Sequence, residues 1–305
     1  VQHEMISIEE IGKIKKPIVW TLHDAWPFSS TNHYPSSTSK EIMPLNDYIN
    51  KNDIPLNKRI DKWCLERKLK SWKQPMKIVC PSNWIAKCAR DSELMKNWDI
   101  NVIPNPLNTN IFFPINKKKA RNFLQIPLNK KLIVFGALDG TKDLRKGGDL
   151  LFKTLNILKE INNDFNLITF GKSDAINKET GLSVDCFDMG FISKDKDLAL
   201  IYSAADILIM PSRMESFGQV ASESMACGTA VIGFNTSGIK DIIDDNENGF
   251  LVRRFDCSEM AAKINIYLRN DSMRKSFESK AREKALKMWS YNVVASKYIN
   301  LYKKN

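Results

Sequence analysis

Residues 211–234 read PSRMESFGQVASESMACGTAVIGF and hold two glutamates, Glu215 and Glu223, eight positions apart. A short turn with Gly218 separates them, and apolar runs flank the segment. A carboxylate accepts hydrogen bonds from two donors at once, so each glutamate could hold a pair of neighbouring hydroxyls, such as the vicinal diol of a sugar ring. Solvated helix surfaces also carry glutamates at this spacing, so the pattern alone leaves both readings open.

The turn between the glutamates is a candidate anion site. The strand expected at 206–212, DILIMPS, ends at Ser212, and Gly218 permits a tight turn into the helix that holds Glu223. The backbone amides of residues 216–219 would then point outward from a helix N-terminus, where an oxyanion or a hydroxyl binds well. Ligands of open α/β sheets bind at the carboxyl ends of strands, so the residues after this strand are expected to be functional.

The same stretch resembles the E-x7-E signature of family 4 retaining glycosyltransferases, which have the two-domain GT-B fold. Further segments fall where that family has comparable ones, so the resemblance extends over nearly the whole chain. They are TLHDAWPF, PSNWIAKCARDSELMKNWDINVIPNPLNTNIFFP, DLRKGGDLL and NENGFLV.

The resemblance implies roles for residues around the glutamates. Glu215 matches the glutamate that faces the donor sugar, and Glu223 matches the one that holds the ribose hydroxyls of the nucleotide. The backbone of Ser216, Phe217 and Gly218, with the amide of Gln219, matches the turn that contacts the donor sugar and phosphate.

Two further matches are a cation and a histidine. Lys146 in RKGG matches the lysine that neutralises the donor diphosphate, where a fixed cation stabilises the charge of the leaving group without a metal. His23 in TLHD matches a histidine that faces the donor sugar, and Asp24 beside it is expected to orient the ring. Taken alone, a lysine before a helix or a histidine after a strand is more often structural.

The chain departs from the family pattern at two places. Ala137 stands where an arginine that pairs with the lysine is expected, and Arg145 is the hypothetical substitute. TLHD comes almost at once, so the opening β/α units of the first domain are expected to be missing, which would leave that domain poorly stable and the chain weakly active.

The elements that position these residues alternate between apolar strands and helices. Continuous apolar strands separated by helices indicate a parallel sheet covered on both faces. The predicted fold class is therefore α/β, with two Rossmann-like doubly wound parallel-sheet domains (GT-B), the first incomplete. The basic segment 115–131 is expected to be a linker with a short helix. The predicted domains are a partial N-terminal one at 1–114, a nucleotide-sugar-binding one at 115–290, and a helix at 291–305 that crosses back to the first.

Composition limits the partners. The chain has 305 residues and a formal net charge of +11, which favours an anionic partner such as nucleotide phosphates, nucleic acid or an acidic membrane surface. Its six cysteines lack CxxC spacing, and several lie in apolar runs, which indicates buried thiols and a reducing compartment. We expect a cytoplasmic protein, with peripheral contact to the inner membrane surface as a further hypothesis.

The leading interpretation is a metal-independent glycosyltransferase that moves a hexose from a UDP- or GDP-linked donor to a glycan or lipid-linked acceptor with retention, in cell-surface polysaccharide or glycoconjugate synthesis. No cofactor is expected. The alternatives are a non-catalytic nucleotide-sugar binding module or inactive fragment, and a nucleic-acid binder, which is disfavoured because the basic residues form no stripe. A nicotinamide oxidoreductase is disfavoured because no G-x-G-x-x-G follows a strand.

Overall fold

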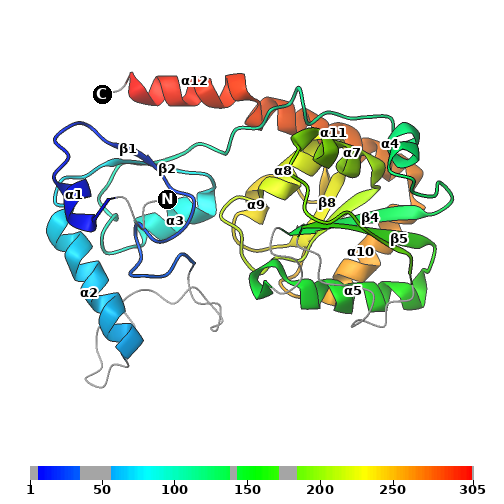
Figure 1. The fold of residues 1–305 in the computed structure, drawn as a ribbon, viewed down its shortest axis with the longest axis horizontal. Coiled ribbons are helices and arrows are strands. Elements are labelled where there is room, and N and C mark those ends of the chain that lie inside the picture. The colour runs from blue at the N-terminus through cyan, green and yellow to red at the C-terminus, as the bar shows by residue number, and fades with distance from the viewer. Residues whose placement is uncertain (1–5, 35–55, 138–142, 172–183, 304–305) are drawn as a thin grey trace. The chain divides into compact units, whose positions relative to one another are not determined.

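A computed structural model describes residues 6–34, 56–137, 143–171 and 184–303 of the chain. Its internal contacts form two compact units, unit 1 of Val1–Pro104 and unit 2 of Asn105–Asn305 (Figure 1). The stretch of about 35 residues after Asp24 is rich in Ser, Asn and Pro, which predicts a long loop. Much of it lies at 35–55, outside the described residues.

Unit 1 contains a parallel sheet of three strands in the order β1-β2-β3. Its core is built from the sheet and the helices beside it, and includes the fully buried Ile78, Cys80 and Ile85. The elements are α1 (Ile8–Gly12), β1 (Val19–Thr21), α2 (Leu56–Ser71), β2 (Lys77–Cys80), α3 (Asn83–Arg90) and β3 (Ile100–Val102).

Unit 2 contains a six-stranded parallel sheet in the order β6-β5-β4-β7-β8-β9. The chain starts in the middle, moves outward through β5 and β6, and returns to build the other half from β7. This is the doubly wound Rossmann order, and its direction reverses between β4 and β7. The strands are β4 (Lys131–Ala137), β5 (Phe165–Gly171), β6 (Cys186–Asp188), β7 (Ile207–Met210), β8 (Ala230–Phe234) and β9 (Gly249–Val252).

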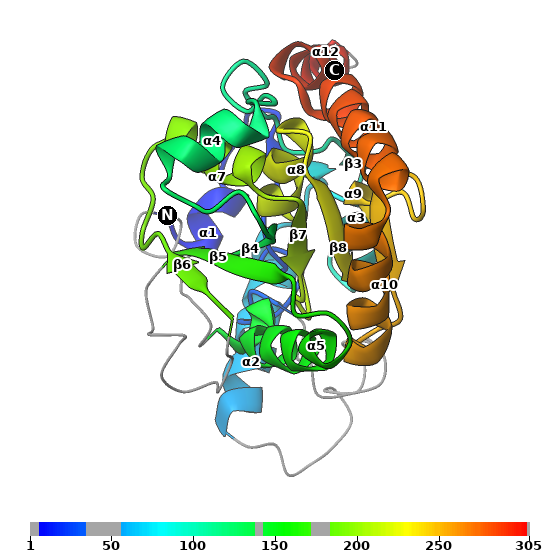
Figure 2. The ribbon, with the colours of Figure 1, turned by 90° about the vertical axis from the view of Figure 1, so that its right-hand side faces the viewer.

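Helices cover both faces of this sheet, as Figures 1 and 2 show, so the strands are buried on both sides. One core layer lies under α5 and α10, and the other lies under α4, α7, α8 and α11. The helical elements are α4 (Lys117–Phe123), the 3-10 turn η3 (Leu144–Lys146), α5 (Gly148–Ile161), α7 (Asp195–Ala204), α8 (Gln219–Ala226), α9 (Ile239–Ile242), α10 (Cys257–Arg269), α11 (Asp271–Trp289) and α12 (Tyr291–Tyr302).

The predicted α/β class with parallel sheets is confirmed. All residues of β7 and β8 are buried, which explains why these strands read as unbroken apolar runs. Cys80 and Cys227 are buried thiols, as the apolar runs around them predicted, and Cys64 and Cys257 are buried as well. The predicted crossing of residues 291–305 to the first domain stays a prediction.

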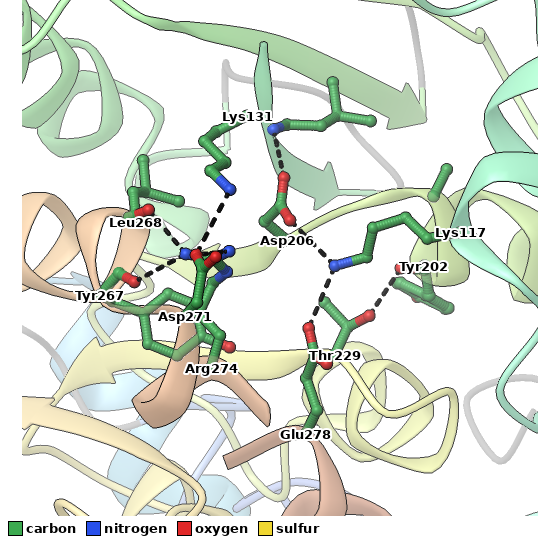
Figure 3. Close-up of polar contacts among 12 residues, drawn as sticks. Lys117, Lys131, Tyr202, Asp206, Thr229, Tyr267, Leu268, Asp271, Arg274 and Glu278 are labelled. Carbon is green, nitrogen blue, oxygen red and sulfur yellow. Dashed lines mark hydrogen bonds and ion pairs between the residues drawn. The ribbon is translucent and has the colours of Figure 1, made fainter. Parts of the chain in front are cut away.

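The basic segment at 115–131 is a packed part of unit 2, so its interpretation as a linker is wrong. Asp206, which precedes β7, is buried and accepts hydrogen bonds from Lys117 Nζ (2.9 Å), Arg121 Nη2 (2.7 Å) and the amide of Leu132 (2.8 Å). Figure 3 shows Lys117 reaching between Asp206 and Glu278. These bonds attach α4 to the amino end of the sheet.

Among the described residues, no helix has both the length and the apolar character that a membrane span needs.

Candidate functional site

The reversal of strand order in unit 2 marks the expected ligand site. Strands on either side of such a reversal send their following helices to opposite faces, which opens a crevice at the carboxyl ends. Here β4 ends at Ala137 and is followed by η3 and α5, whereas β7 ends at Met210 and is followed by residues 211–218 and α8. Most of the predicted site residues lie on these two connections.

Two helices begin at this crevice, and each starts from a glycine in the left-handed conformation. Gly147 (φ 72°) precedes α5, and Gly218 (φ 105°) precedes α8. Ser, Thr, Asp and Asn are preferred just before a helix, because their side-chain oxygen accepts a hydrogen bond from a backbone amide of the first turn. No described side chain caps α5 or α8 in that way. The first-turn amides of both helices can therefore serve an anion.

Gly147 brings the two connections into direct backbone contact. A Cβ atom at this position would lie 2.1 Å from the carbonyl oxygen of Pro211, so only glycine fits. Beside it, the Arg213 amide donates to the Arg145 carbonyl at 2.8 Å. The glycine after Lys146 is thus required both for its left-handed turn and for the close approach that fixes Lys146 beside the segment after β7.

The structure brings Lys146 and Glu215 together. Lys146 Nζ lies 2.6 Å from Glu215 Oε1, and the two side chains are only 20% and 8% exposed. Ser212 Oγ donates to the same oxygen at 2.9 Å. Since an ammonium group has three donors, Lys146 can keep this ion pair and still bind a phosphate oxygen.

The backbone of Glu215 is held as firmly as its side chain. Its amide donates to Ser237 Oγ at 2.9 Å, and its carbonyl accepts from the Gly238 amide at 2.9 Å. A Cβ at position 238 would lie 2.6 Å from the Ser216 carbonyl oxygen, so the loop after β8 is in close backbone contact with the turn that follows Glu215. The sequence interpretation missed Ser212 and Ser237. The one signal in the sequence that could have pointed to Ser237 is its position, because Ser237-Gly238 comes shortly after the segment 211–234 that holds both glutamates.

Two arginines flank the lysine. Arg145 Nη2 lies 2.9 Å from Asp143 Oδ2, so its guanidinium has a carboxylate partner in this structure. Arg213, which the sequence interpretation missed, binds both carboxylate oxygens of Asp149 at 2.6 and 2.7 Å and the Leu144 carbonyl at 2.6 Å. Its hydrogen bonds hold the pKa of Asp149 below its usual range. Arg213 therefore ties α5 to the segment after β7.

Glu223 has a different partner from Glu215. Its Oε2 accepts a hydrogen bond of 2.9 Å from the hydroxyl of Tyr202, a fully buried residue of α7. Burial raises the pKa of Glu223 to about 7, although the hydrogen bonds from Tyr202 and Gln219 oppose the shift. Burial also raises the pKa of Tyr202 well above its usual value. Tyr202 was not predicted as a site residue, because a tyrosine within an apolar helix gives no separate signal.

The other residues between Glu215 and Glu223 offer mainly their backbone amides to a ligand. Phe217 is 3% exposed and packs edge-on against Trp289, with ring centroids 6.1 Å apart, so its side chain belongs to the core. Ser216 is also buried. Gln219 is the first residue of α8, and its Oε1 accepts from Asn105 Nδ2 at 3.4 Å.

His23 is an exposed residue of unit 1, two positions after the end of β1 at Thr21. The expectation that Asp24 orients its ring is not met. Asp24 Oδ2 lies 2.7 Å from His33 Nδ1, and Asp24 Oδ1 accepts from the Trp26 amide. A short turn carries the carboxylate away from its neighbour toward His33. The predicted contact of His23 with the donor sugar stays a prediction.

The part of the chain that the structure describes contains no cluster of three or more His, Cys, Asp or Glu side chains that could hold a metal ion.

Comparisons with known proteins agree on one family. The family model for glycosyl transferases group 1 matches residues 116–284. The D-inositol 3-phosphate glycosyltransferase of Xylanimonas cellulosilytica is 29% identical over 67% of this chain and 51% of its own length. The chain thus spans about half the length of the curated relatives it matches.

Solved structures show the same fold. Sucrose-phosphate synthase from Thermosynechococcus elongatus aligns with a TM-score of 0.72 and 22% identity, over 96% of this chain and 68% of the other. Anabaena HepE, solved in complex with UDP and glucose, aligns with a TM-score of 0.69 and 17% identity, over 95% and 72%. The predicted GT-B class is confirmed. Because the family model covers more than half of the chain, including Lys146 and both glutamates, the protein belongs to the group 1 glycosyl transferases.

Proposed function

We propose that the chain transfers a hexose from a UDP- or GDP-linked donor to a hydroxyl of a glycan or lipid-linked acceptor, with retention of the anomeric configuration. One observation carries the proposal. The ion pair of Lys146 and Glu215 lies where two helices, neither capped by a described side chain, begin beside the strand-order reversal. This arrangement offers a cation and two sets of amides to a diphosphate, and a carboxylate to sugar hydroxyls.

The diphosphate is proposed to lie between the N-termini of α5 and α8, with Lys146 as its cation. A departing nucleoside diphosphate gains negative charge in the transition state, and a fixed ammonium with oriented amides stabilises that charge. Arg145 is the second candidate cation, because Ala137 replaces the arginine expected from the family resemblance. Lys146 is proposed as the main group, because the family resemblance assigns it to the diphosphate and it directly precedes Gly147, from which α5 begins.

The hydroxyls of the donor are proposed to bind the two glutamates. Glu215 shares one oxygen between Lys146 and Ser212, so its other oxygen can accept from the sugar. Glu223 would accept from the ribose hydroxyls with the oxygen atom that Tyr202 does not bind, since Tyr202 donates to Oε2. Support comes from HepE, a fold relative that was solved with UDP and glucose.

The proposed reaction needs no side-chain nucleophile. The bond between the anomeric carbon and the diphosphate oxygen breaks, and the acceptor oxygen attacks the same face of the sugar. The acceptor proton passes to the departing phosphate oxygen, and the nucleoside diphosphate leaves. The chain contributes position and fixed charge, which can supply most of a rate enhancement.

The test compares binding with turnover. Thermal shift with UDP, GDP and their sugars identifies the nucleotide, because a bound ligand stabilises the protein by RT ln(1 + [L]/Kd). Glu215→Ala should retain nucleoside diphosphate binding and lose turnover by about 100-fold or more, as removal of a transition-state contact does. Glu283→Ala, at an exposed site of α11, is the control. Failure of the unmodified chain to bind either nucleotide would refute the proposal.

The alternative is a nucleotide-sugar binding module without catalysis. The missing arginine at position 137 favours it, because the diphosphate would have one fixed cation fewer. Nucleotide binding without turnover by the unmodified chain would establish this alternative.

A further inference from the structure

The segment after β1 forms a compact loop, residues 24–33, which we call the β1 loop. Its ends are joined by a hydrogen bond of 2.8 Å from the Ala25 amide to the His33 carbonyl. Within it, the Ser29 amide donates to the Ala25 carbonyl at 2.8 Å, and Ser29 Oγ donates to the Asn32 carbonyl at 2.6 Å. His23 lies between this loop and Leu22, whose amide donates to the Val79 carbonyl at 2.8 Å, so the β1 loop and the sheet together hold His23.

One face of α2 holds the β1 loop. Asp61, Cys64 and Lys68 follow at spacings of three and four residues, which places them on one side of the helix. Asp61 Oδ1 accepts from the Thr31 amide at 3.3 Å and from its hydroxyl. Cys64 Sγ donates to the Ser30 carbonyl at 3.2 Å.

Lys68 makes the largest contribution to this contact. Its side chain is fully buried, with 0% exposure. The ammonium donates to the carbonyls of Ser29 (3.1 Å), Ser30 (2.9 Å) and Trp26. These three bonds use all three donors of the group. Nζ also lies 3.9 Å from the centroid of the Trp26 ring, within the range of a cation–π interaction.

A buried charge at this position is costly, and its hydrogen bonds to the three carbonyls offset that cost. Burial lowers the pKa of Lys68 to about 8, while the charges of Cys64 and Asp24 oppose the shift. The other titratable groups around it are Asp61 on α2 and His33 in the β1 loop. The ammonium links α2 to three carbonyls of the β1 loop, in addition to the bonds that Asp61 and Cys64 make to Thr31 and Ser30.

We propose that Lys68 is a positioning residue that holds the β1 loop, and with it His23, in the conformation that sugar transfer requires. The proposal rests on the proposed function through the predicted role of His23. Lys68 acts only within unit 1, whereas the proposed diphosphate site lies in unit 2. Loss of Lys68 should therefore lower turnover and leave nucleoside diphosphate affinity unchanged.

The first test is Lys68→Met, with Lys70→Met as the control at an exposed position of the same helix. Turnover is measured as release of UDP or GDP from the corresponding UDP- or GDP-hexose, and affinity by titration with UDP or GDP. We expect kcat to fall at least about tenfold in Lys68→Met, with Kd for the nucleotide within about twofold, as loss of positioning alone predicts. A kcat within about twofold of the unmodified chain would overturn the proposal.

A pH profile separates positioning from general destabilisation. The kcat of the unmodified chain should fall between about pH 7 and 9.5 as Lys68 loses its proton, whereas that of Lys68→Met should stay level. Cys64→Ala should keep the alkaline fall, which assigns the titration to the lysine and not to the thiol. A fall that persists in Lys68→Met would overturn the assignment.

Hydrogen exchange of the unmodified chain covers the case in which the variant fails to fold or no donor is turned over. After correction for intrinsic rates, the β1 loop should open more often at about pH 9.5 than at pH 7, while β7 in unit 2 keeps its protection. Equal protection of the β1 loop at both pH values would overturn the proposal that Lys68 holds this loop. Failure to bind UDP or GDP would instead count against the proposed function.

Discussion

Lys146 Nζ and Glu215 Oε1 lie 2.6 Å apart, although the two residues are 69 positions apart in the chain. Two glycines make this ion pair possible. Gly147 lets the turn of Lys146 touch the Pro211 carbonyl, and Gly238 lets the loop after β8 approach the glutamate turn. The cation and the carboxylate are therefore placed by the same backbone contacts, and a change in either contact should affect both.

Removal of the cation should weaken nucleotide binding. Lys146→Met keeps the length of the side chain and removes the charge, so UDP or GDP should bind about 10- to 100-fold more weakly, as loss of a charge-assisted hydrogen bond at a half-buried site predicts. Isothermal titration measures the change. Lys153→Met, at an exposed position of α5, is the matched control. Equal affinities in both variants would contradict the assignment of Lys146 to the diphosphate.

Gly147→Ala should destabilise unit 2 more than the backbone conformation alone explains. Gly147 and Gly190 have similar left-handed φ values of 72° and 61°, but a Cβ at 190 meets no atom within 4 Å. Gly190→Ala should therefore cost about 1 kcal/mol of unfolding free energy. Gly147→Ala should cost about 1–3 kcal/mol more, because its Cβ would overlap the Pro211 carbonyl. Chemical denaturation of both variants measures the difference, and equal costs would contradict the steric argument.

The sheet of unit 2 could be predicted closely from the sequence, because strands buried on both faces read as apolar runs. The apolar runs FNLITFG (165–171), AVIGF (230–234) and GFLV (249–252) predict strands that match β5, β8 and β9 residue for residue. The three-residue β6 was missed, since it is an edge strand whose residues are partly exposed. The pattern after Ser82 predicts a helix through about Met95, but α3 ends at Arg90, because Ser92 Oγ donates to the Ala89 carbonyl and starts a new turn.

The site could be predicted only in part. The glutamates and Lys146 were found through the resemblance, and their ion pair follows from the topology that places both connections at one crevice. The groups that hold the glutamates, such as Tyr202 and Ser237, come from distant segments and have no periodic pattern. Asp24 was assigned to its sequence neighbour His23, but the turn directs it to His33. Short-range pattern therefore predicts elements well and side-chain partners poorly.

Nucleotide binding should depend on pH through Glu223. The pKa of this carboxyl is about 7, and only the ionised form accepts hydrogen bonds from both ribose hydroxyls. UDP or GDP affinity should therefore rise about tenfold from pH 6 to 8, with most of the change near pH 7. Glu223→Gln should lack the affinity change that comes from this carboxyl group. The pH dependence that remains in this variant measures the effect of phosphate titration, which is then subtracted. Parallel pH profiles of the two proteins would contradict the ribose role.

The same carboxyl should affect stability in the opposite direction. Its folded-state pKa of about 7 lies above the ordinary value of 4.5, so the folded chain binds the proton more tightly than the unfolded chain. Stability from this group is therefore present below pH 4.5 and is lost as pH rises through 7. The free energy of unfolding of Glu223→Gln, relative to the unmodified chain, should rise by up to about 3 kcal/mol between pH 4.5 and 8. If the difference in unfolding free energy between the two proteins did not change with pH, the raised pKa of Glu223 would be contradicted.

Asp206 should matter for folding and not for ligand binding. Burial alone would raise the pKa of Asp206, but the charges of Lys117 and Arg121 outweigh burial and lower it below the ordinary value of 3.8. The stability that this group contributes is therefore present above pH 3.8, and it is lost as the pH falls through the lower pKa of the folded state. Asp206→Asn leaves Arg121 buried without its carboxylate, which should cost about 3–5 kcal/mol of unfolding free energy at neutral pH. Denaturant titration measures it.

Asp271→Asn is the control for this change, since Asp271 also pairs with an arginine but its side chain is 76% exposed, and its loss should destabilise the chain far less than the loss of Asp206. Asp206 precedes β7, at the end of the sheet opposite the crevice. The folded fraction of Asp206→Asn should therefore bind UDP or GDP with unchanged affinity. Weakened binding by this fraction would mean that the two ends of the sheet are coupled, against the separation of fold and site that the topology implies.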